Sequence, residues 1–186
     1  MKVCLDPGHG GKDRGNRGPT GYVEADGTLD IALRVRSILK KKGIDPIMTR
    51  DKDITVSLAG RTLISNKGGA GILVSIHTNA GPRGAGGIET YYSAFSSRGK
   101  VLAREIQKRL APLGLEDRGT KTRLGNSGRD YYHMIRTPRA ISVIVEVGFH
   151  TNPQEEQLLK TSGFRQRAAE GIAAGIVSFL FLSHTL

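Results

Sequence analysis

The chain is poor in residues that several common kinds of protein require. It has one cysteine, no tryptophan and an aromatic fraction of only 5%. A single cysteine excludes an intramolecular disulfide and argues against a cysteine-rich structural zinc site. We expect Cys4, which lies inside an apolar run, to be a small buried residue rather than a reactive thiol. The scarcity of aromatics and the absence of a zinc-finger or RNA-binding signature argue against a nucleic-acid-binding protein.

Long apolar runs are also missing. The longest, at 172–182, is too short to span a bilayer, and we expect it to be a helix of the core. No charged and apolar leader precedes the first expected strand, so we expect no signal peptide. The 186 residues show no linker or repeat and fit a single domain.

Acidic residues are few compared with basic ones. Lys and Arg number 28 and Asp and Glu 17, which gives a formal net charge of +11. Such a chain is attracted to polyanions, which include nucleic acid, anionic lipid and bacterial envelope polymers. Charge alone does not choose among them. The lysines at 40–42 also have a local explanation, as cations at the end of a helix that stops at Gly43.

Strand and helix patterns alternate along the chain. Apolar runs predict strands at 2–6, 44–49, 72–77, 87–92 and 141–146, the second at a sheet edge because of Pro46. Helical periodicity predicts helices at 29–42, 57–67, 98–113, 154–160 and 164–182. Thr28 is the expected N-cap of the first helix, and 115–139 is expected to be a basic loop. The alternation predicts an α/β domain with a twisted, mostly parallel sheet and helices on both faces.

Three of these strands run into residues that bind metals or transfer protons, namely His9, His77 and Glu146. The carboxyl ends of parallel strands meet at one edge of a sheet, so we expect the three side chains to lie together. Glu24, on the loop ahead of the first helix, adds a carboxylate. Two imidazoles and one carboxylate with an open fourth position form a common catalytic zinc set.

Other interpretations of these motifs stay open or fail. The glycine-rich start is not a phosphate loop, because Asp6 and Asp13 stand at positions that the Walker pattern reserves for other residues. Taken singly, His9 and His77 also suit ordinary loop or core positions, and their spacing with Glu24 matches no local helical motif. A basic nuclease is a further alternative, although such enzymes use carboxylate-rich, often two-metal sites.

The motifs occur together and in order in one enzyme family. They are DPGHGG at 6–11, Glu24, TRD at 49–51, Arg61, SIHTNA at 75–80, GIETYY at 87–92, RG at 118–119, VEVGF at 145–149 and NP at 152–153. With them the chain resembles the zinc-dependent N-acetylmuramoyl-L-alanine amidases of amidase type 3, over almost its whole length. It departs from the usual pattern at His150, where an apolar residue is common, and at Thr78, where a small one is.

The resemblance implies a fold, a reaction and a set of site residues. The family has a six-stranded sheet flanked by helices and cleaves the amide between N-acetylmuramic acid and the L-alanine of the stem peptide. The resemblance implies that His9, Glu24 and His77 bind one Zn²⁺ and that Glu146 is the catalytic acid and base. Residues 1–186 would then be a single catalytic amidase domain without a separate wall-binding domain.

Substrate contacts are expected from Asn79, Asn126 and Arg118, although asparagine is also a common loop residue. The basic residues of the 115–139 loop, Arg118 among them, are expected to form a rim that meets acidic stem peptides or envelope polymers. We expect His133 and His150 to have surface or supporting roles, and His184 to take no part.

The expected partners are bacterial peptidoglycan and, through the net charge, anionic envelope polymers, with no nucleic acid and no transmembrane segment. We expect a monomer. The preferred biological role is that of a phage endolysin, which stays in the host cytoplasm until it is released to the cell wall. The alternative is the catalytic domain of a bacterial autolysin, outside the cell as part of a longer secreted protein.

Overall fold

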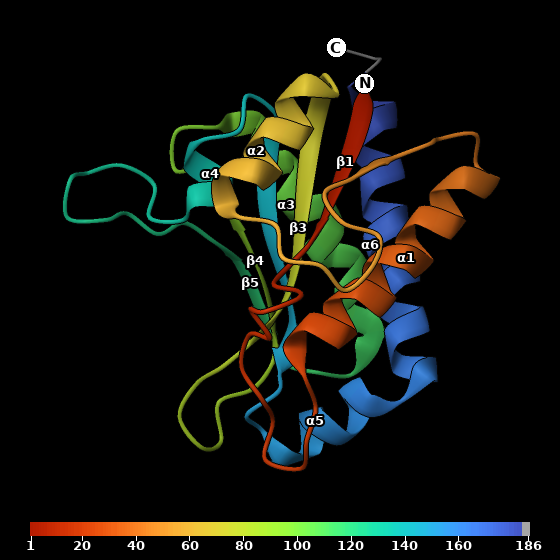
Figure 1. Ribbon diagram of the computed structural model, residues 1–186, viewed down its shortest axis with the longest axis vertical. Coiled ribbons are helices and arrows are strands. Elements are labelled where there is room, and N and C mark those ends of the chain that lie inside the picture. Colours follow the sequence, from red (N-terminus) through yellow and green to blue (C-terminus); the bar gives the residue numbers. More distant parts are fainter. Residues whose placement is uncertain (184–186) are drawn as a thin grey trace.

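A six-stranded sheet in the order β2-β1-β3-β6-β4-β5 forms the centre of the molecule (Figure 1). This computed structural model describes residues 1–183. The strands are β1 (Lys2–Pro7), β2 (Ile47–Met48), β3 (Ala70–Asn79), β4 (Ile88–Tyr92), β5 (Asp117–Lys121) and β6 (Ile141–Phe149). Four of them, β2, β1, β3 and β6, are parallel, whereas β4 and β5 run the opposite way. The predicted mostly parallel α/β domain is confirmed.

Helices cover both faces of this sheet (Figure 1). On one face, α1 (Glu24–Lys41), α3 (Ser97–Leu110) and α6 (Ser162–Leu182) pack on one another and on the strands. On the other lie α2 (Leu58–Lys67) and the short α4 (His133–Arg136). A 3-10 turn, η1 (Ala111–Leu113), follows α3, and α5 (Pro153–Lys160) follows β6. Among residues 1–183, no helix has the length and apolar character needed to cross a membrane.

Side chains alternate between the two faces of each strand, and the sheet therefore separates two hydrophobic clusters. Val3 and Leu5 of β1 belong to the large cluster beneath α1, α3 and α6. Cys4, between them, belongs to a smaller cluster on the opposite face, with Leu73 and Met134. Burial raises the pKa of the Cys4 thiol to about 12. Because the thiolate is the nucleophilic form, Cys4 is a packing residue, as expected.

The first helix begins earlier than predicted. It starts at Glu24, and Thr28 lies inside it rather than at its N-cap. Its N-cap residue, Val23, makes no side-chain capping hydrogen bond. Instead, the backbone N–H of Glu24 donates to the carbonyl oxygen of Asn16 at 3.2 Å, so the preceding loop satisfies a donor that a cap would otherwise satisfy. The Thr28 hydroxyl donates to the carbonyl oxygen of Gly8 at 2.8 Å and ties the helix to the loop after β1.

Other boundaries shift as well. The strand predicted at 44–49 shrinks to β2 at Ile47–Met48, although its edge position is confirmed. The loop predicted at 115–139 contains β5 and α4. The β5 sequence DRGTK has no apolar alternation, so it carried no strand signal. Strands β3 and β6 continue past His77 and Glu146, which therefore lie inside strands and not at their ends.

Candidate active site

Four chain segments bring together the residues that the sequence singled out. In the register of β3 and β6, His77 and Glu146 are direct partners, so their side chains leave the sheet on the same face. His9 lies just beyond the end of β1, which pairs with β3 on its other side. Glu24 is the first residue of α1. The predicted meeting of these side chains at one edge of the sheet is confirmed for the two histidines and Glu24.

Glu24 lies between the two histidines. Its Oε2 is 3.2 Å from Nε2 of His9, and its Oε1 is 3.1 Å from Nδ1 of His77. The two imidazole rings are 5.1 Å apart and nearly perpendicular. One nitrogen of each histidine and one oxygen of Glu24 lie within 4.8 Å of one another. This spacing and this donor set suit a transition metal that prefers nitrogen and carboxylate ligands.

Glu24 and each of the two histidines stabilise each other in their charged forms. Burial by itself lowers the pKa of His77, but the Glu24 carboxylate and the charge of Glu146 raise it to about 9. The pKa of His9 is likewise raised, against the effect of burial, by Glu24 and Asp13. Burial opposes ionisation of Glu24, yet the two imidazoles hold its pKa well below the usual range. The cluster is therefore held together by charge as well as by hydrogen bonds.

Two buried arginines fix the loop that carries His9. Arg61 donates to the carbonyl oxygen of His9 at 2.6 Å and pairs with Asp6 at 2.7 Å. Arg50 donates to the carbonyl oxygen of Gly8 at 2.8 Å. His9 has a φ of 60°, which residues with a side chain seldom adopt. The arginine contacts thus hold His9 in a conformation that the chain alone would disfavour.

Gly8 is required by the close approach of the His77 ring. A Cβ atom at this position would lie 2.2 Å from Cε1 of His77, closer than any real contact. Only glycine therefore allows His77 to lie against the loop after β1.

Asp13 orients His9 from outside the cluster. Its Oδ2 lies 2.9 Å from Nδ1 of His9, which leaves Nε2 directed toward Glu24. A carboxylate on the far nitrogen fixes the tautomer and the ring orientation of a metal-binding histidine. Sequence reasoning missed this role and used Asp13 only to exclude a phosphate loop. Its spacing, four residues after His9, is the signal that could have found it.

Glu146 has an unused hydrogen-bonding atom. Its Oε2 is buried and has no hydrogen-bond partner within residues 1–183. Burial raises the pKa of this carboxyl to about 7, with the nearby negative charges of Glu24 and Glu89 also raising it and His77 lowering it. A carboxyl that ionises near neutral pH and keeps a free oxygen can both accept and return a proton.

The three expected substrate-binding residues lie in two different places. Asn79 donates to Oε1 of Glu89 at 2.9 Å, and Arg118 donates to Oε2 of the same carboxylate at 2.6 Å. Glu89 is the direct partner of Glu146 across β4 and β6, so Asn79 and Arg118 both bind a carboxylate that is next to Glu146. Asn126 is exposed in the loop between β5 and α4, which projects from the sheet edge in Figure 1. The structure does not bring it to the other two.

The two departures from the usual family pattern contact each other. The Thr78 hydroxyl lies 2.9 Å from Nδ1 of His150, which is fully buried. The backbone N–H of Thr78 donates to Oε1 of Glu24 at 3.3 Å, so Thr78 contacts both His150 and the Glu24 carboxylate. His133 bonds a threonine of α2 and takes no part in the cluster. His184 lies outside the described residues.

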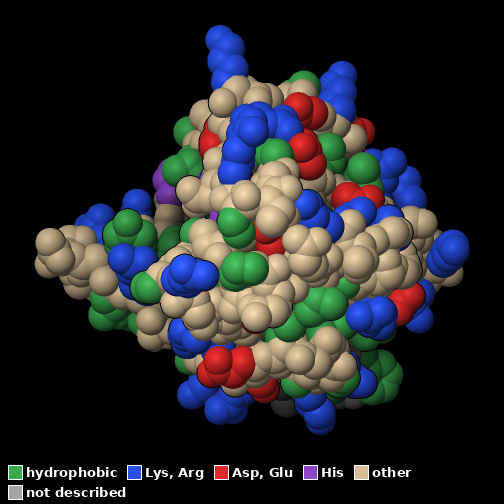
Figure 2. Space-filling view, turned by 90° about the horizontal axis from the view of Figure 1, so that it is seen from below, with side chains coloured by type: hydrophobic (Ala, Val, Ile, Leu, Met, Phe, Trp, Pro, Cys, Tyr) green, Lys and Arg blue, Asp and Glu red, His purple; other side chains and the backbone are tan. Residues whose placement is uncertain are grey.

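A cavity of about 190 Å³ opens beside the cluster. His9 and His77 line one side, and Leu58 of α2 and Met134 of α4 line another. Figure 2 views the molecule from the end at which β1, β3 and β6 finish, and Lys and Arg side chains surround this face. The cavity itself is lined by Asp6, Asp13 and Arg61 as well as by the two histidines.

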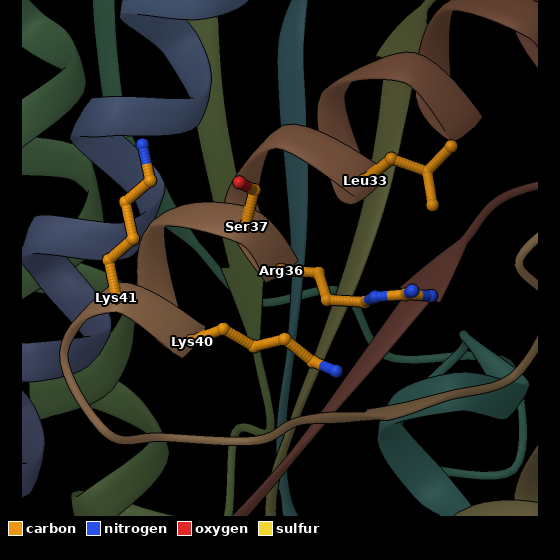
Figure 3. A pocket seen from close by; sticks show the side chains of 5 residues that line it. All are labelled: Leu33, Arg36, Ser37, Lys40 and Lys41. Carbon is orange, nitrogen blue, oxygen red and sulfur yellow. The ribbon is translucent and has the colours of Figure 1, made fainter.

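A second hollow lies on the surface of α1 and is lined mainly by basic residues. Figure 3 shows the residues that line it, Leu33, Arg36, Ser37, Lys40 and Lys41. Arg36 lies 3.7 Å from Asp51, and Lys40 lies 3.0 Å from Asp45. These basic residues end the helix before Gly43, which has a φ of 77°, as the sequence predicted. Their charge is partly neutralised by the loop that follows.

Comparisons with known proteins agree with this geometry. Residues 3–178 match the family described as N-acetylmuramoyl-L-alanine amidase. The chain is 36% identical to the amidase LytC of Bacillus subtilis over 95% of its length, but spans only 35% of LytC. It is 38% identical to the endolysin of Bacillus phage SPP1, covering 97% of this chain and 66% of the endolysin. The catalytic domain of CwlV, an amidase of Paenibacillus polymyxa, superposes with a TM-score of 0.87 at 38% identity, over 97% of this chain and 99% of that domain.

Proposed function

The chain belongs to the N-acetylmuramoyl-L-alanine amidase family, and we propose that it hydrolyses the amide between N-acetylmuramic acid and L-alanine in peptidoglycan. One observation carries the proposal: the cluster of His9, Glu24 and His77 lies beside Glu146 at one edge of the sheet. Amides react slowly because the carbonyl is weakly electrophilic and the amine is a poor leaving group. The cluster and Glu146 address these two obstacles separately.

The cluster supplies the ligands for one Zn²⁺ in this proposal. Nε2 of His9, the carboxylate of Glu24 and Nδ1 of His77 would hold it, since these atoms already converge. Three protein ligands leave a further position for water or substrate, which is typical of catalytic rather than structural sites. When bound, Zn²⁺ polarises the scissile carbonyl and lowers the pKa of a bound water to about 7. Asp13 and the two buried arginines keep His9 in place for it.

Glu146 is the acid and base of the reaction in this proposal. It accepts a proton from the attacking water and then returns it to the nitrogen of the leaving L-alanine. Its unpartnered Oε2 and its pKa near 7 support both steps at neutral pH. The same carboxyl can act twice because the first transfer leaves it protonated for the second.

Substrate contacts complete the proposal. Asn79 and Arg118 border the peptide that follows the scissile bond, because both bind Glu89 next to Glu146. Asn126, on its projecting loop, contacts a more distant part of the polymer. The net charge of +11 draws the protein, acting as a monomer, to anionic envelope polymers.

Within the family we propose the role of a phage endolysin, delivered from the host cytoplasm to the wall. The 38% identity to the SPP1 endolysin supports it. The 36% identity to LytC supports the alternative, the catalytic domain of a longer secreted autolysin.

The proposal is tested by mass spectrometry of purified peptidoglycan after digestion by zinc-loaded protein. We expect free stem peptides that begin with L-alanine, and intact glycan strands. Glu146→Gln should lower the rate by about 10²–10⁴-fold. Glu170→Gln, an exposed glutamate of α6, is the matched control and should have normal activity. Cleaved sugars, or full activity of Glu146→Gln, would contradict the proposal.

A further inference from the structure

Glu89 is a buried carboxylate beside the site that accepts four hydrogen bonds. Its side chain is only 3% exposed. Oε1 accepts hydrogen bonds from Asn79 at 2.9 Å and from the Tyr91 hydroxyl at 2.8 Å. Oε2 accepts from Arg118 at 2.6 Å and from Lys121 at 2.5 Å. A carboxylate has about four acceptor positions, so Glu89 has none left for a substrate.

Lys121 and Arg118, the two cations bound to Glu89, still have unused hydrogen-bond donors. Lys121 uses one of its three N–H donors on Glu89, its only ion-pair or hydrogen-bond partner within residues 1–183. The Nη2 atom of Arg118 has no partner in that part of the chain either, while Nη1 reaches Gly86 and, at 4.0 Å, the exposed Glu116. Both side chains are about one-third exposed, at 34% and 30%. A ligand here must therefore accept hydrogen bonds.

Charge favours an anionic ligand. Two cations share one buried carboxylate, which leaves the group of Glu89, Arg118 and Lys121 with a charge of +1. Glu116 offsets little of this, because its side chain is 68% exposed and lies at the limit of ion-pair distance. Buried groups such as Glu89 hold the two cations in fixed positions, which favours binding of a planar carboxylate.

The position of Glu89, Arg118 and Lys121 selects one carboxylate of the substrate. Glu89 is the direct partner of Glu146, and the charged ends of both cations bond Glu89 on β4, which lies one strand spacing, roughly 5 Å, from β6. One residue extends a peptide by about 3.5 Å. The first free carboxylate after the scissile bond of a stem peptide is the α-carboxylate of the γ-linked glutamate that follows L-alanine. It fits this span, whereas the C-terminal carboxylate lies farther along.

We infer that Lys121 and Arg118, held by Glu89, form a subsite for the free α-carboxylate of the second stem-peptide residue, so that this residue's ionisation determines substrate preference. The inference rests on the proposed function. Lys121 is the specificity-determining member, because within residues 1–183 Glu89 is its only acidic partner, whereas Arg118 also faces Glu116.

The test uses product peptides as inhibitors of peptidoglycan digestion by the full-length chain. Three tripeptides of L-alanine, γ-linked D-glutamate and L-lysine are compared: one with all carboxylates free, one amidated at the glutamate α-carboxylate, and one amidated at the C-terminus. We expect the peptide with the free glutamate α-carboxylate to inhibit about tenfold better than its α-amide, because a charge-assisted hydrogen bond is lost. The peptide amidated at the C-terminus should inhibit as well as the free one.

Variants separate the subsite from a general structural effect. Lys121→Gln should abolish the preference, and Lys121→Arg should restore it. Lys100→Gln, an exposed lysine of α3, is the matched control and should keep it. Equal inhibition by the acid and the α-amide, or a preference that survives Lys121→Gln, would overturn the subsite while the amidase function stands. Failure of the wild-type chain to release stem peptides would overturn the proposed function itself.

Discussion

Near the strand ends that carry the site, the two faces of the sheet bury different kinds of side chain. Toward α1, α3 and α6, the strands direct fully buried apolar residues such as Leu5 and Val74. The next residues along the same strands, Asp6 and Ser75, are also buried but polar, and they point toward α2 and the site. Adjacent residues of one strand therefore belong to different environments, because strand side chains alternate between faces.

This difference shows how each face is stabilised. The apolar face depends on buried area, which is spread over many residues. The polar face depends on specific partners: Asp6 accepts hydrogen bonds from Thr49 at 2.6 Å, from Ser75 at 2.7 Å and from Arg61 at 2.7 Å. A conservative change should thus be tolerated on the first face, whereas loss of one partner on the second should be costly.

Removal of Arg61 should have the largest effect. Arg61→Met leaves Asp6, only 1% exposed, without its cation and frees the carbonyl oxygen of His9. Breaking a buried ion pair from one side costs about 3–5 kcal/mol, so the free energy of unfolding should fall by that amount. Urea denaturation of the metal-free protein measures it. Arg104→Met, at an exposed position of α3, is the control and should lie within about 0.5 kcal/mol of wild type.

A substitution at Asp13 tests the polar face without changing a buried residue. Asp13→Asn removes the charge that orients His9, while Asp13 itself is 64% exposed on its side chain. Zinc affinity should fall about 10–100-fold, the usual effect of losing such a supporting carboxylate, and stability should change little. A competition assay with a chromophoric chelator measures it. Asp45→Asn, in the loop after α1, should leave the affinity unchanged. An unchanged affinity in Asp13→Asn would show that the loop alone holds His9.

As pH rises, the free energy of unfolding of the metal-free protein should fall, whereas its affinity for zinc should rise. Without metal, Glu24 and Glu146 raise the pKa of His77 to about 9, above its usual value of 6.5. Its contribution to stability is therefore complete below pH 6.5 and is lost as pH rises through about 9. Zinc binds the neutral imidazole, so its affinity should rise about tenfold per pH unit for each proton displaced. Denaturation and chelator competition between pH 6.5 and 9 measure both trends; parallel trends would contradict the assignment.

The same contrast explains how much of the fold could be predicted from sequence. The central strands were predictable because residues such as those at 72–76 form a continuous apolar run. The start of α1 was not, because a hydrogen bond from Glu24 to the loop at Asn16 replaces the side-chain cap that was predicted at Thr28. Strand β5 is polar, and it forms because it pairs with β4, a contact distant in sequence.

For the site, residue types and strand ends predicted the meeting of His9, Glu24 and His77, whose atoms converge as expected. Sequence could not show what surrounds them. The bond from Asp13 to His9 depends on a loop conformation with positive φ. The position of Glu89 beside Glu146 depends on β4 running antiparallel to β6, and the predicted mostly parallel sheet did not say which strands run the opposite way.

The smallest effect is expected on the apolar face, at the residue before His77. Ile76 is fully buried in the large hydrophobic cluster, whereas the next residue, His77, points to the site. Ile76→Val removes one methylene group and should lower the free energy of unfolding by about 0.5–1.5 kcal/mol. Zinc affinity and the rate of peptidoglycan digestion should stay at the wild-type values. The paired variant Ser75→Ala, on the opposite face of the same strand, leaves Asp6 one donor short and should cost about 1–3 kcal/mol. If Ile76→Val instead weakened zinc binding more than Ser75→Ala, the strand would transmit packing changes to the site, and the two faces would not be independent.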